Sequence, residues 1–122
     1  MKIFCLSIYN ENFDLFENLN LVPVGLGNQN FDTKWLNDRG KINISEKNEN
    51  FGEYTFHYHL WKNNLIDLNN NSWIGFCTYR RLWANLDHDK VINFNNLSRN
   101  ILMKPHKDWL NFEVVLVKPL IF

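Results

Sequence analysis

The run Ile3–Ile8 constrains the fold of this chain more than any other feature of the sequence. It is a continuous apolar run of the kind found in strands that a parallel sheet buries on both faces. Trp73–Tyr79 has the composition of a second buried strand. Helical patterns at residues 12–20 and 51–65 lie between them. Strands that alternate with helices predict an α/β fold with a mostly parallel sheet flanked by helices.

Shorter patterns add elements to this outline. Leu21–Val24 is predicted as a strand in which Pro23 marks an edge or strand-start position, since proline cannot donate to a ladder. The helix at 51–65 can be capped by Asn50, and Glu53 follows at the spacing of a capping box. These signals predict a sheet of at least three strands and one well-defined helix.

The remaining segments are less regular. Residues 28–50 are polar, and a loop of that length is often functional. A helix is predicted near Leu97–Met103, ended by Pro105, and a last strand at Glu113–Val117. No helix follows to cover that apolar strand, and an uncovered apolar strand is an aggregation liability. We therefore expect residues 1–122 to form a single domain that is truncated, the N-terminal part of a longer protein.

Composition and charge exclude several classes of protein. The chain is 45% hydrophobic and 16% aromatic, which is too apolar for a disordered chain. Thirteen basic residues balance thirteen acidic ones, whereas proteins that neutralise nucleic-acid phosphates usually carry a basic excess. We expect no nucleic-acid partner, and any anionic ligand must be held by a local pocket.

The two cysteines and the lengths of the apolar segments indicate where in the cell the protein is located. Cys5 and Cys77 lie inside the apolar runs, which favours buried reduced thiols over a disulfide framework. The N-terminal apolar run is too short for a signal peptide, and no window approaches the ~18 apolar residues of a membrane span. We expect a cytoplasmic protein with no membrane span, and peripheral membrane association stays open.

Three segments are expected to meet at one edge of the sheet, because ligands of open α/β sheets bind beyond the carboxyl ends of the strands. They are the loop Gly25–Gly27, the polar loop Asp38–Asn48 and the strand end Tyr79–Arg81. The two glycines let the backbone pass close to a ligand. The loop lacks the spacing of a dinucleotide fingerprint, however, so a plain turn is the simpler interpretation.

Arg80 and Arg81 carry the strongest chemical signal. The guanidinium group is permanently charged and binds phosphate or carboxylate through two parallel hydrogen bonds. Two such groups at the end of a buried strand are costly unless an anion meets them. Successive strand residues point to opposite faces, so one arginine is expected to reach the ligand. The alternative is a structural ion pair with Glu53, Asp38 or Asp67.

Other titratable residues have simpler explanations. His57 and His59 lie two apart on a helix and face different ways, so they do not form a metal pair. Asp87-His88-Asp89 is similar to a metal-binding Asp-x-Asp, but it lies in a polar loop where a solvated turn suffices. The absence of a nucleophile elbow, a phosphate loop and a Cys-x-x-Cys motif argues against a hydrolase, a P-loop enzyme and a zinc module.

Three segments in fixed order also carry a family resemblance. They are the loop Asp38–Asn48 with its N-I-S-x-K-N ending, Glu53–Asn63 with the pattern E-x-T-x-x-Y-x-x-W-K-N, and Gly75–Arg81 with G-x-x-x-Y-R-R. Together they resemble the bacterial capsular and exopolysaccharide biosynthesis family known as domain of unknown function forty-four twenty-two. The chain departs from the family at Thr78, where His is frequent, and at His59, where an aromatic residue is frequent.

The resemblance implies a fold and an activity. The family is similar to nucleotide-sugar transferases of the GT-A type, which have a Rossmann-like sheet, so a nucleotide-sugar donor and a saccharide acceptor are the expected partners. In that architecture the strand after the helix ends in a metal-binding Asp-x-Asp, and here Tyr79–Arg81 occupies that place. Positive side chains would then neutralise the departing diphosphate. No metal ligand is assigned and no cofactor is certain, and a need for a divalent metal stays open.

The resemblance also suggests residue roles. Arg80 and Arg81 would stabilise the leaving group, Tyr79 would shape the sugar pocket, and Glu53 would orient an arginine. Gly25 and Gly27 would let the backbone approach the nucleotide. Its ribose and phosphates would be lined by five residues of the polar loop: Asp38, Asn43, Ser45, Lys47 and Asn48. The competing hypothesis is a non-catalytic interaction module in which both arginines form structural ion pairs.

Overall fold

A four-stranded parallel sheet organises the computed structural model, which describes residues 1–67, 72–85 and 89–116. Its strand order is β3-β2-β1-β4, and every pairing is parallel. The strands are β1 (Lys2–Ser7), β2 (Val22–Gly25), β3 (Leu36–Asn37) and β4 (Ile74–Thr78). The α/β class with a parallel sheet is thereby confirmed, and β1, β2 and β4 coincide with the three strands predicted from residues 3–8, 21–24 and 73–79.

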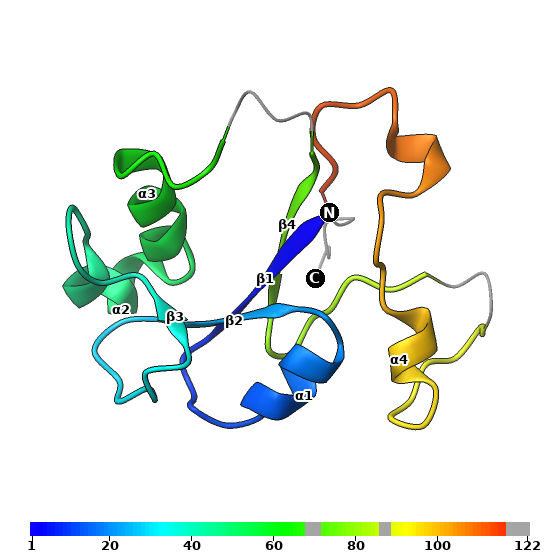
Figure 1. The fold of residues 1–122 in the computed structure, drawn as a ribbon, viewed down its shortest axis with the longest axis horizontal. Helices are drawn as coiled ribbons and strands as arrows, with labels where there is room; N and C mark the ends of the chain where they lie inside the picture. The colour runs from blue at the N-terminus through cyan, green and yellow to red at the C-terminus, as the bar shows by residue number, and fades with distance from the viewer. Residues whose placement is uncertain (68–71, 86–88, 117–122) are drawn as a thin grey trace.

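Short helices connect and flank these strands (Figure 1). They are α1 (Phe13–Asn18), α2 (Asn48–Phe51), α3 (Tyr54–Lys62) and α4 (Leu97–Asn100), with 3-10 turns at Ser45–Lys47 and Lys107–Trp109. Helix α1 confirms the helical pattern at residues 12–20. Within the described residues no helix has the length and apolarity that crossing a membrane requires.

Two apolar layers cover the two faces of the sheet, because alternate residues of a strand point to opposite faces. Ile3 and Cys5 of β1 pack with Phe16 of α1 and with Ile101. Phe4 and Leu6 belong instead to a cluster that includes Phe56 and Leu60 of α3. The rings of Phe4 and Phe56 meet edge to face at 5.2 Å. The central strand β1 is therefore buried from both sides, as its unbroken apolar run predicts.

The predicted helix at 51–65 is wrong at its start. Gly52 has φ 53° and ψ −132°, a conformation open only to glycine, and it separates α2 from α3. Glu53 is the residue at the N-terminal cap of α3, and no side chain caps the helix. The prediction of a capping box formed by Asn50 and Glu53 is therefore wrong. Helix α3 ends at Lys62, where Asn64 adopts a left-handed conformation that terminates it.

Later segments also differ from the sequence-based expectation. Strand β3 lies inside residues 28–50, which were expected to be irregular. Helix α4 stops at Asn100, before the predicted end at Met103, because Ile101 is extended and forms a bridge with Ala84. The predicted last strand is wrong for residues 113–116, which have no ladder partner among the described residues, and Val117 lies outside them.

Pro23 shows how a proline fits an interior strand. The predicted edge position is wrong, because β2 lies between β1 and β3, and Pro23 is the second residue of β2, next to its start. The Leu26 N–H donates to the Ser7 carbonyl, so by alternation the nitrogen of Pro23 points away from β1. On that side pairing with β3 begins only at Val24. No ladder hydrogen bond is therefore lost.

Cys5 and Cys77 are register partners on β1 and β4, and both are free and buried. The hydrogen bond with Cys5, together with burial, raises the pKa of Cys77, so this thiol stays protonated and unreactive. We expect an aromatic disulfide reagent at mildly alkaline pH to label neither cysteine until the chain is unfolded in guanidinium chloride. A Ser98→Cys variant, exposed on α4, supplies a positive control. Labelling of the folded native chain as fast as that control would contradict the burial described.

Candidate functional site

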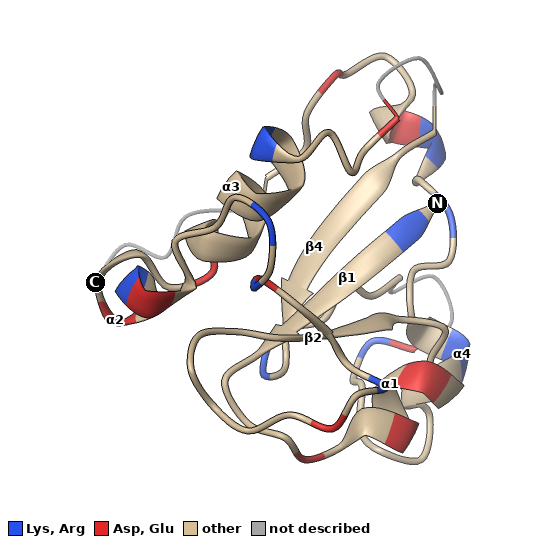
Figure 2. Ribbon diagram, turned by 60° about the vertical axis from the view of Figure 1, so that its left-hand side comes forward, with Lys and Arg blue, Asp and Glu red and all other residues tan. Residues whose placement is uncertain are grey.

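The carboxyl ends of β1, β2 and β4 meet at one edge of the sheet (Figure 2). Ser7 pairs with Gly25 on one side, and on the other the Tyr79 N–H donates to the Leu6 carbonyl at 3.0 Å. Two strand spacings, about 10 Å, therefore separate the backbones of Gly25 and Tyr79. The chain leaves β1 toward β2 on one side and returns as β4 on the other. This makes the β1–β4 boundary a topological switch point, the place where open α/β sheets bind ligands.

A tight turn follows β4 at this edge. Thr78 and Arg81 exchange both backbone hydrogen bonds, at 3.2 and 3.0 Å, so the chain reverses immediately after the strand. The expectation that strand alternation separates Arg80 from Arg81 is therefore wrong, since both belong to the turn and both are exposed. Arg80 places its guanidinium 5.1 Å from the centre of the Tyr79 ring, a cation–π contact.

Neither arginine has a carboxylate partner within residues 1–67, 72–85 and 89–116. Among the described residues no Asp or Glu lies within ion-pair distance of Arg80 or Arg81. Tyr79 is half-buried beside them, with the ring of Tyr9 edge-on at 5.2 Å. Desolvation raises the pKa of Tyr79, against the opposing charge of Arg80, so the phenol stays protonated at neutral pH. The turn thus presents two cations to solvent, with the protonated phenol of Tyr79 beside them.

The loop after β2 is held by a buried carboxylate. Asp38 is fully buried and accepts hydrogen bonds from the Gly27 N–H, at 3.1 and 3.3 Å, and from the Thr55 hydroxyl. Gly27 has φ 69°, and a Cβ at that position would lie 3.0 Å from the Cβ of Asn48. Arg39 adds a 2.7 Å hydrogen bond from Nε to the Gly27 carbonyl. Burial leaves Asp38 no surface for a ligand, so it positions the loop.

The polar side chains of residues 43–48 are also engaged internally. Asn43 Oδ1 accepts from the backbone N–H and the hydroxyl of Ser45, which is itself buried. Asn48 Nδ2 donates to the Gly52 carbonyl at 2.8 Å and to the Thr55 hydroxyl at 3.0 Å. Lys47 differs, because its side chain is exposed. Asn43, Ser45 and Asn48 therefore build the loop, whereas Lys47 extends into solvent.

This loop is tied to α3 by contacts that the sequence did not reveal. Asn63 Nδ2 donates to the Ile42 carbonyl at 2.7 Å, and Asn63 Oδ1 accepts from the Ile42 N–H at 3.2 Å. The buried His59 ring places Nδ1 3.2 Å from the same carbonyl. His59 thus holds the loop in place. In the sequence, the one signal for Asn63 was its place in the W-K-N ending of the helix pattern.

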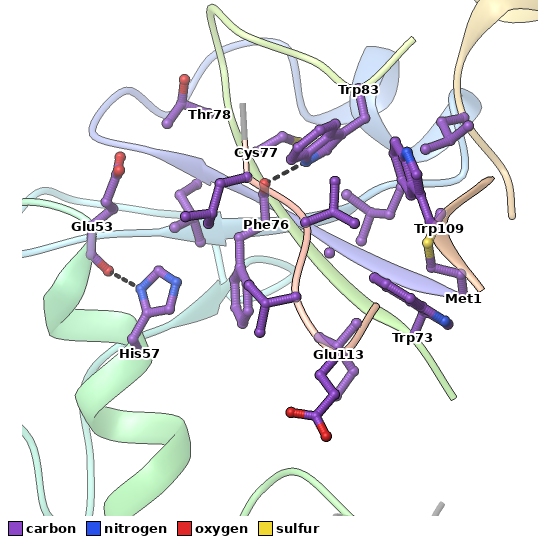
Figure 3. Close-up of a pocket in the computed structure, with 18 of the residues that line it drawn as sticks. Met1, Glu53, His57, Trp73, Phe76, Cys77, Thr78, Trp83, Trp109 and Glu113 are labelled. Carbon is purple, nitrogen blue, oxygen red and sulfur yellow. Dashed lines mark hydrogen bonds between the residues drawn. The ribbon is translucent and has the colours of Figure 1, made fainter. Parts of the chain in front are cut away.

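Glu53 lines a separate cavity of about 450 Å³ beside β4 (Figure 3). Figure 3 shows Glu53 and Thr78 at one end of it and Met1 and Trp73 at the other, with apolar and aromatic side chains between them. His57 also faces this cavity, and its Nδ1 lies 2.9 Å from the Glu53 carbonyl oxygen. Neither arginine of the turn lines this cavity, and neither does any residue of the loops at 25–27 and 43–48. The ends of β1, β2 and β4 bring the loop at 25–27 and the turn after β4 to the same edge of the sheet, and Asn48 lies beside Gly27.

The described residues do not fit a divalent metal. They contain no group of three His, Cys, Asp or Glu side chains that could hold one, and the end of β4 presents guanidinium groups, which repel a cation. In the Asp87-His88-Asp89 segment only Asp89 lies within the described residues, and Arg99 binds its carboxylate through two 2.8 Å hydrogen bonds. We therefore assign no step of the chemistry to a metal.

The buried carboxylate gives a direct test of this architecture. Asp38→Ala leaves the Gly27 N–H and the Thr55 hydroxyl without their acceptor, and hydrogen bonds to charged groups are worth about 1.5–3 kcal/mol each. We expect urea unfolding to show a loss of about 3 kcal/mol or more. Asp14→Ala, which removes an exposed ion pair with Lys34, should cost less than about 1 kcal/mol. Equal effects of the two substitutions would show that Asp38 does not hold the loop.

Comparison with known proteins adds one finding. A family model described as "Domain of unknown function (DUF4422)" matches residues 5–118, a range that includes the loops at 25–27 and 38–48 and the turn after β4. No curated protein and no solved structure gave a significant match.

Proposed function

The chain belongs to the family described as Domain of unknown function (DUF4422), and we propose that it is a glycosyltransferase-like protein of surface polysaccharide biosynthesis. In this proposal a sugar passes from a nucleotide-sugar donor to a saccharide acceptor, on a Rossmann-like sheet of the GT-A type. The strand order β3-β2-β1-β4 supports it, since this is the order of the first four strands of a doubly wound nucleotide-binding sheet.

The turn Tyr79–Arg81 is the observation that carries the proposal. It lies at the switch point beside the end of β1, and its two guanidinium groups are exposed and have no carboxylate partner among the described residues. Sugar transfer releases a nucleoside diphosphate whose negative charge grows as the bond to the sugar breaks. Fixed positive groups aimed at that charge stabilise the transition state. Arg80 and Arg81 are suited to this because guanidinium binds phosphate through two hydrogen bonds.

The other candidate residues divide into two roles. Tyr79 and Lys47 are accessible and would contact the ligand with the arginines. The second group shapes the loop beside the ligand without touching it: Gly25, Gly27, Asp38, Asn43, Ser45 and Asn48. Glu53 makes no ion pair with either arginine of the turn, and it faces the cavity beside β4. Its proposed role of orienting an arginine therefore has no contact to support it.

The alternative, a non-catalytic interaction module, requires that Arg80 and Arg81 form structural ion pairs with carboxylates. That pairing is absent from the part of the chain that the structure describes, so nothing there neutralises Arg80 and Arg81. A purely structural role would also give two adjacent exposed cations no energetic purpose, because surface charges contribute little to stability. We therefore favour a bound anion as their partner.

A thermal-shift titration with UDP, GDP and their sugars tests the proposal. At about ten times the Kd, a ligand that binds only the folded chain should raise Tm by roughly 5–10 °C. Arg80→Ala and Arg81→Ala should remove most of that shift, because each deletes a phosphate-binding group. Lys62→Ala, which removes an exposed cation on α3, is the matched control and should keep the full shift. The proposal fails if none of the nucleotides stabilises the chain and Arg81→Ala behaves like the wild type.

A further inference from the structure

Tyr9 lies at the switch point, although no sequence pattern singled it out. It follows β1 by two residues, and its ring meets the half-buried ring of Tyr79 edge to face at 5.2 Å. Arg80 places its guanidinium 5.1 Å from the same Tyr79 ring. The Tyr79 ring therefore contacts both the aromatic ring of Tyr9 and the guanidinium group of Arg80. Tyr9 itself is 52% exposed, so much of its ring is free to meet a ligand.

The backbone of Tyr9 is fixed by a buried hydroxyl. Ser7 Oγ accepts a hydrogen bond from the Tyr9 N–H at 3.0 Å and donates one to the Tyr9 carbonyl at 2.8 Å. Ser7 is 2% exposed, so these bonds are shielded from water. The next residue, Asn10, donates from Nδ2 to the Asn30 carbonyl at 3.3 Å, which connects the loops after β1 and β2. An exposed aromatic ring on a rigid backbone is preorganised for stacking, because little freedom is lost on binding.

We infer that Tyr9 stacks on the base of a nucleoside diphosphate whose phosphates reach Arg80 and Arg81. Such a ligand combines an aromatic face and an anion joined by a ribose, and the edge of the sheet offers an aromatic ring and guanidinium groups on adjacent strand ends. Inorganic pyrophosphate and sugar phosphates have no aromatic face for Tyr9. This inference rests on the proposed function and deepens it, since it names the part of the donor that Tyr9 recognises.

Calorimetric titration of the full chain with UDP, GDP and inorganic pyrophosphate tests the inference. Stacking of a base on an aromatic side chain is lost on substitution by alanine, so Tyr9→Ala should weaken nucleoside diphosphate binding about tenfold or more. Its affinity for pyrophosphate should stay that of the wild type. Tyr9→Phe keeps the ring and should bind all three ligands normally. Arg80→Ala should weaken all three, because each carries the diphosphate.

Tyr58→Ala is the matched control, because Tyr58 lies on α3 beside Lys62 and takes no part in the site. The urea concentration at the midpoint of unfolding shows whether each variant folds. If Tyr9→Ala does not fold, Tyr9→Leu takes its place, because leucine keeps the apolar bulk without an aromatic ring. Wild-type affinity of Tyr9→Ala for UDP and GDP overturns the inference and leaves the proposed function standing. Equal losses for pyrophosphate and nucleotide also overturn it, since they indicate a structural role. No nucleotide binding by the wild type defeats the proposed function itself.

Discussion

The buried Asp38 carboxylate joins three segments that are far apart in the sequence: the loop after β2, the loop after β3 and the first turn of α3. A carboxylate removed from water costs several kcal/mol unless hydrogen bonds replace the lost hydration. Here the Gly27 N–H and the Thr55 hydroxyl provide them, and Asn48 in turn donates to the Thr55 hydroxyl. The position of Gly25–Gly27 at the edge of the sheet therefore depends on one charged group that no ligand can reach.

The turn after β4 has two effects: it protects the edge strand and it exposes the two arginines. Strand β4 is at the edge of the described sheet, and an edge strand exposes unpaired backbone groups that invite aggregation. The reversal at Thr78–Arg81 pairs the backbone of Thr78, and the Trp83 indole N–H donates to the Phe76 carbonyl at 2.7 Å. The same reversal brings Arg80 and Arg81 beside the end of β1. Protection of the edge and display of the cations thus follow from one local conformation.

The parts of the fold that the sequence predicted are those set by burial on both faces of a strand. Ile3–Ile8 and Trp73–Tyr79 are apolar apart from Ser7 and Thr78, and they became neighbouring strands in the middle and at the edge of the sheet. The helix at 51–65 was misplaced because a single backbone conformation at Gly52 interrupts an otherwise helical pattern. The segment at 113–116 was apolar enough for a strand but lacks a partner among the described residues, and pairing is a tertiary property.

The candidate site was harder to predict, for a chemical reason. Amides and hydroxyls such as those of Asn43, Ser45 and Asn48 look the same in a sequence whether they bind a ligand or their own backbone. Tyr9 was missed because a tyrosine after a strand is unremarkable until its contact with Tyr79 is known. Arg80 and Arg81 stood out because the chain has no overall charge to explain them.

Exposure also sets a requirement on how the arginines act. In water, screening reduces the attraction between one guanidinium and one phosphate to little net gain. An open edge therefore binds an anion well only when several groups engage one ligand together. The turn offers Arg80, Arg81 and the Tyr79 hydroxyl within three consecutive residues, and the rigid end of β1 adds the ring of Tyr9. In the proposed complex, the binding energy comes from the stacked ring and the two cations acting together, because a chain with no net charge attracts an anion little at long range.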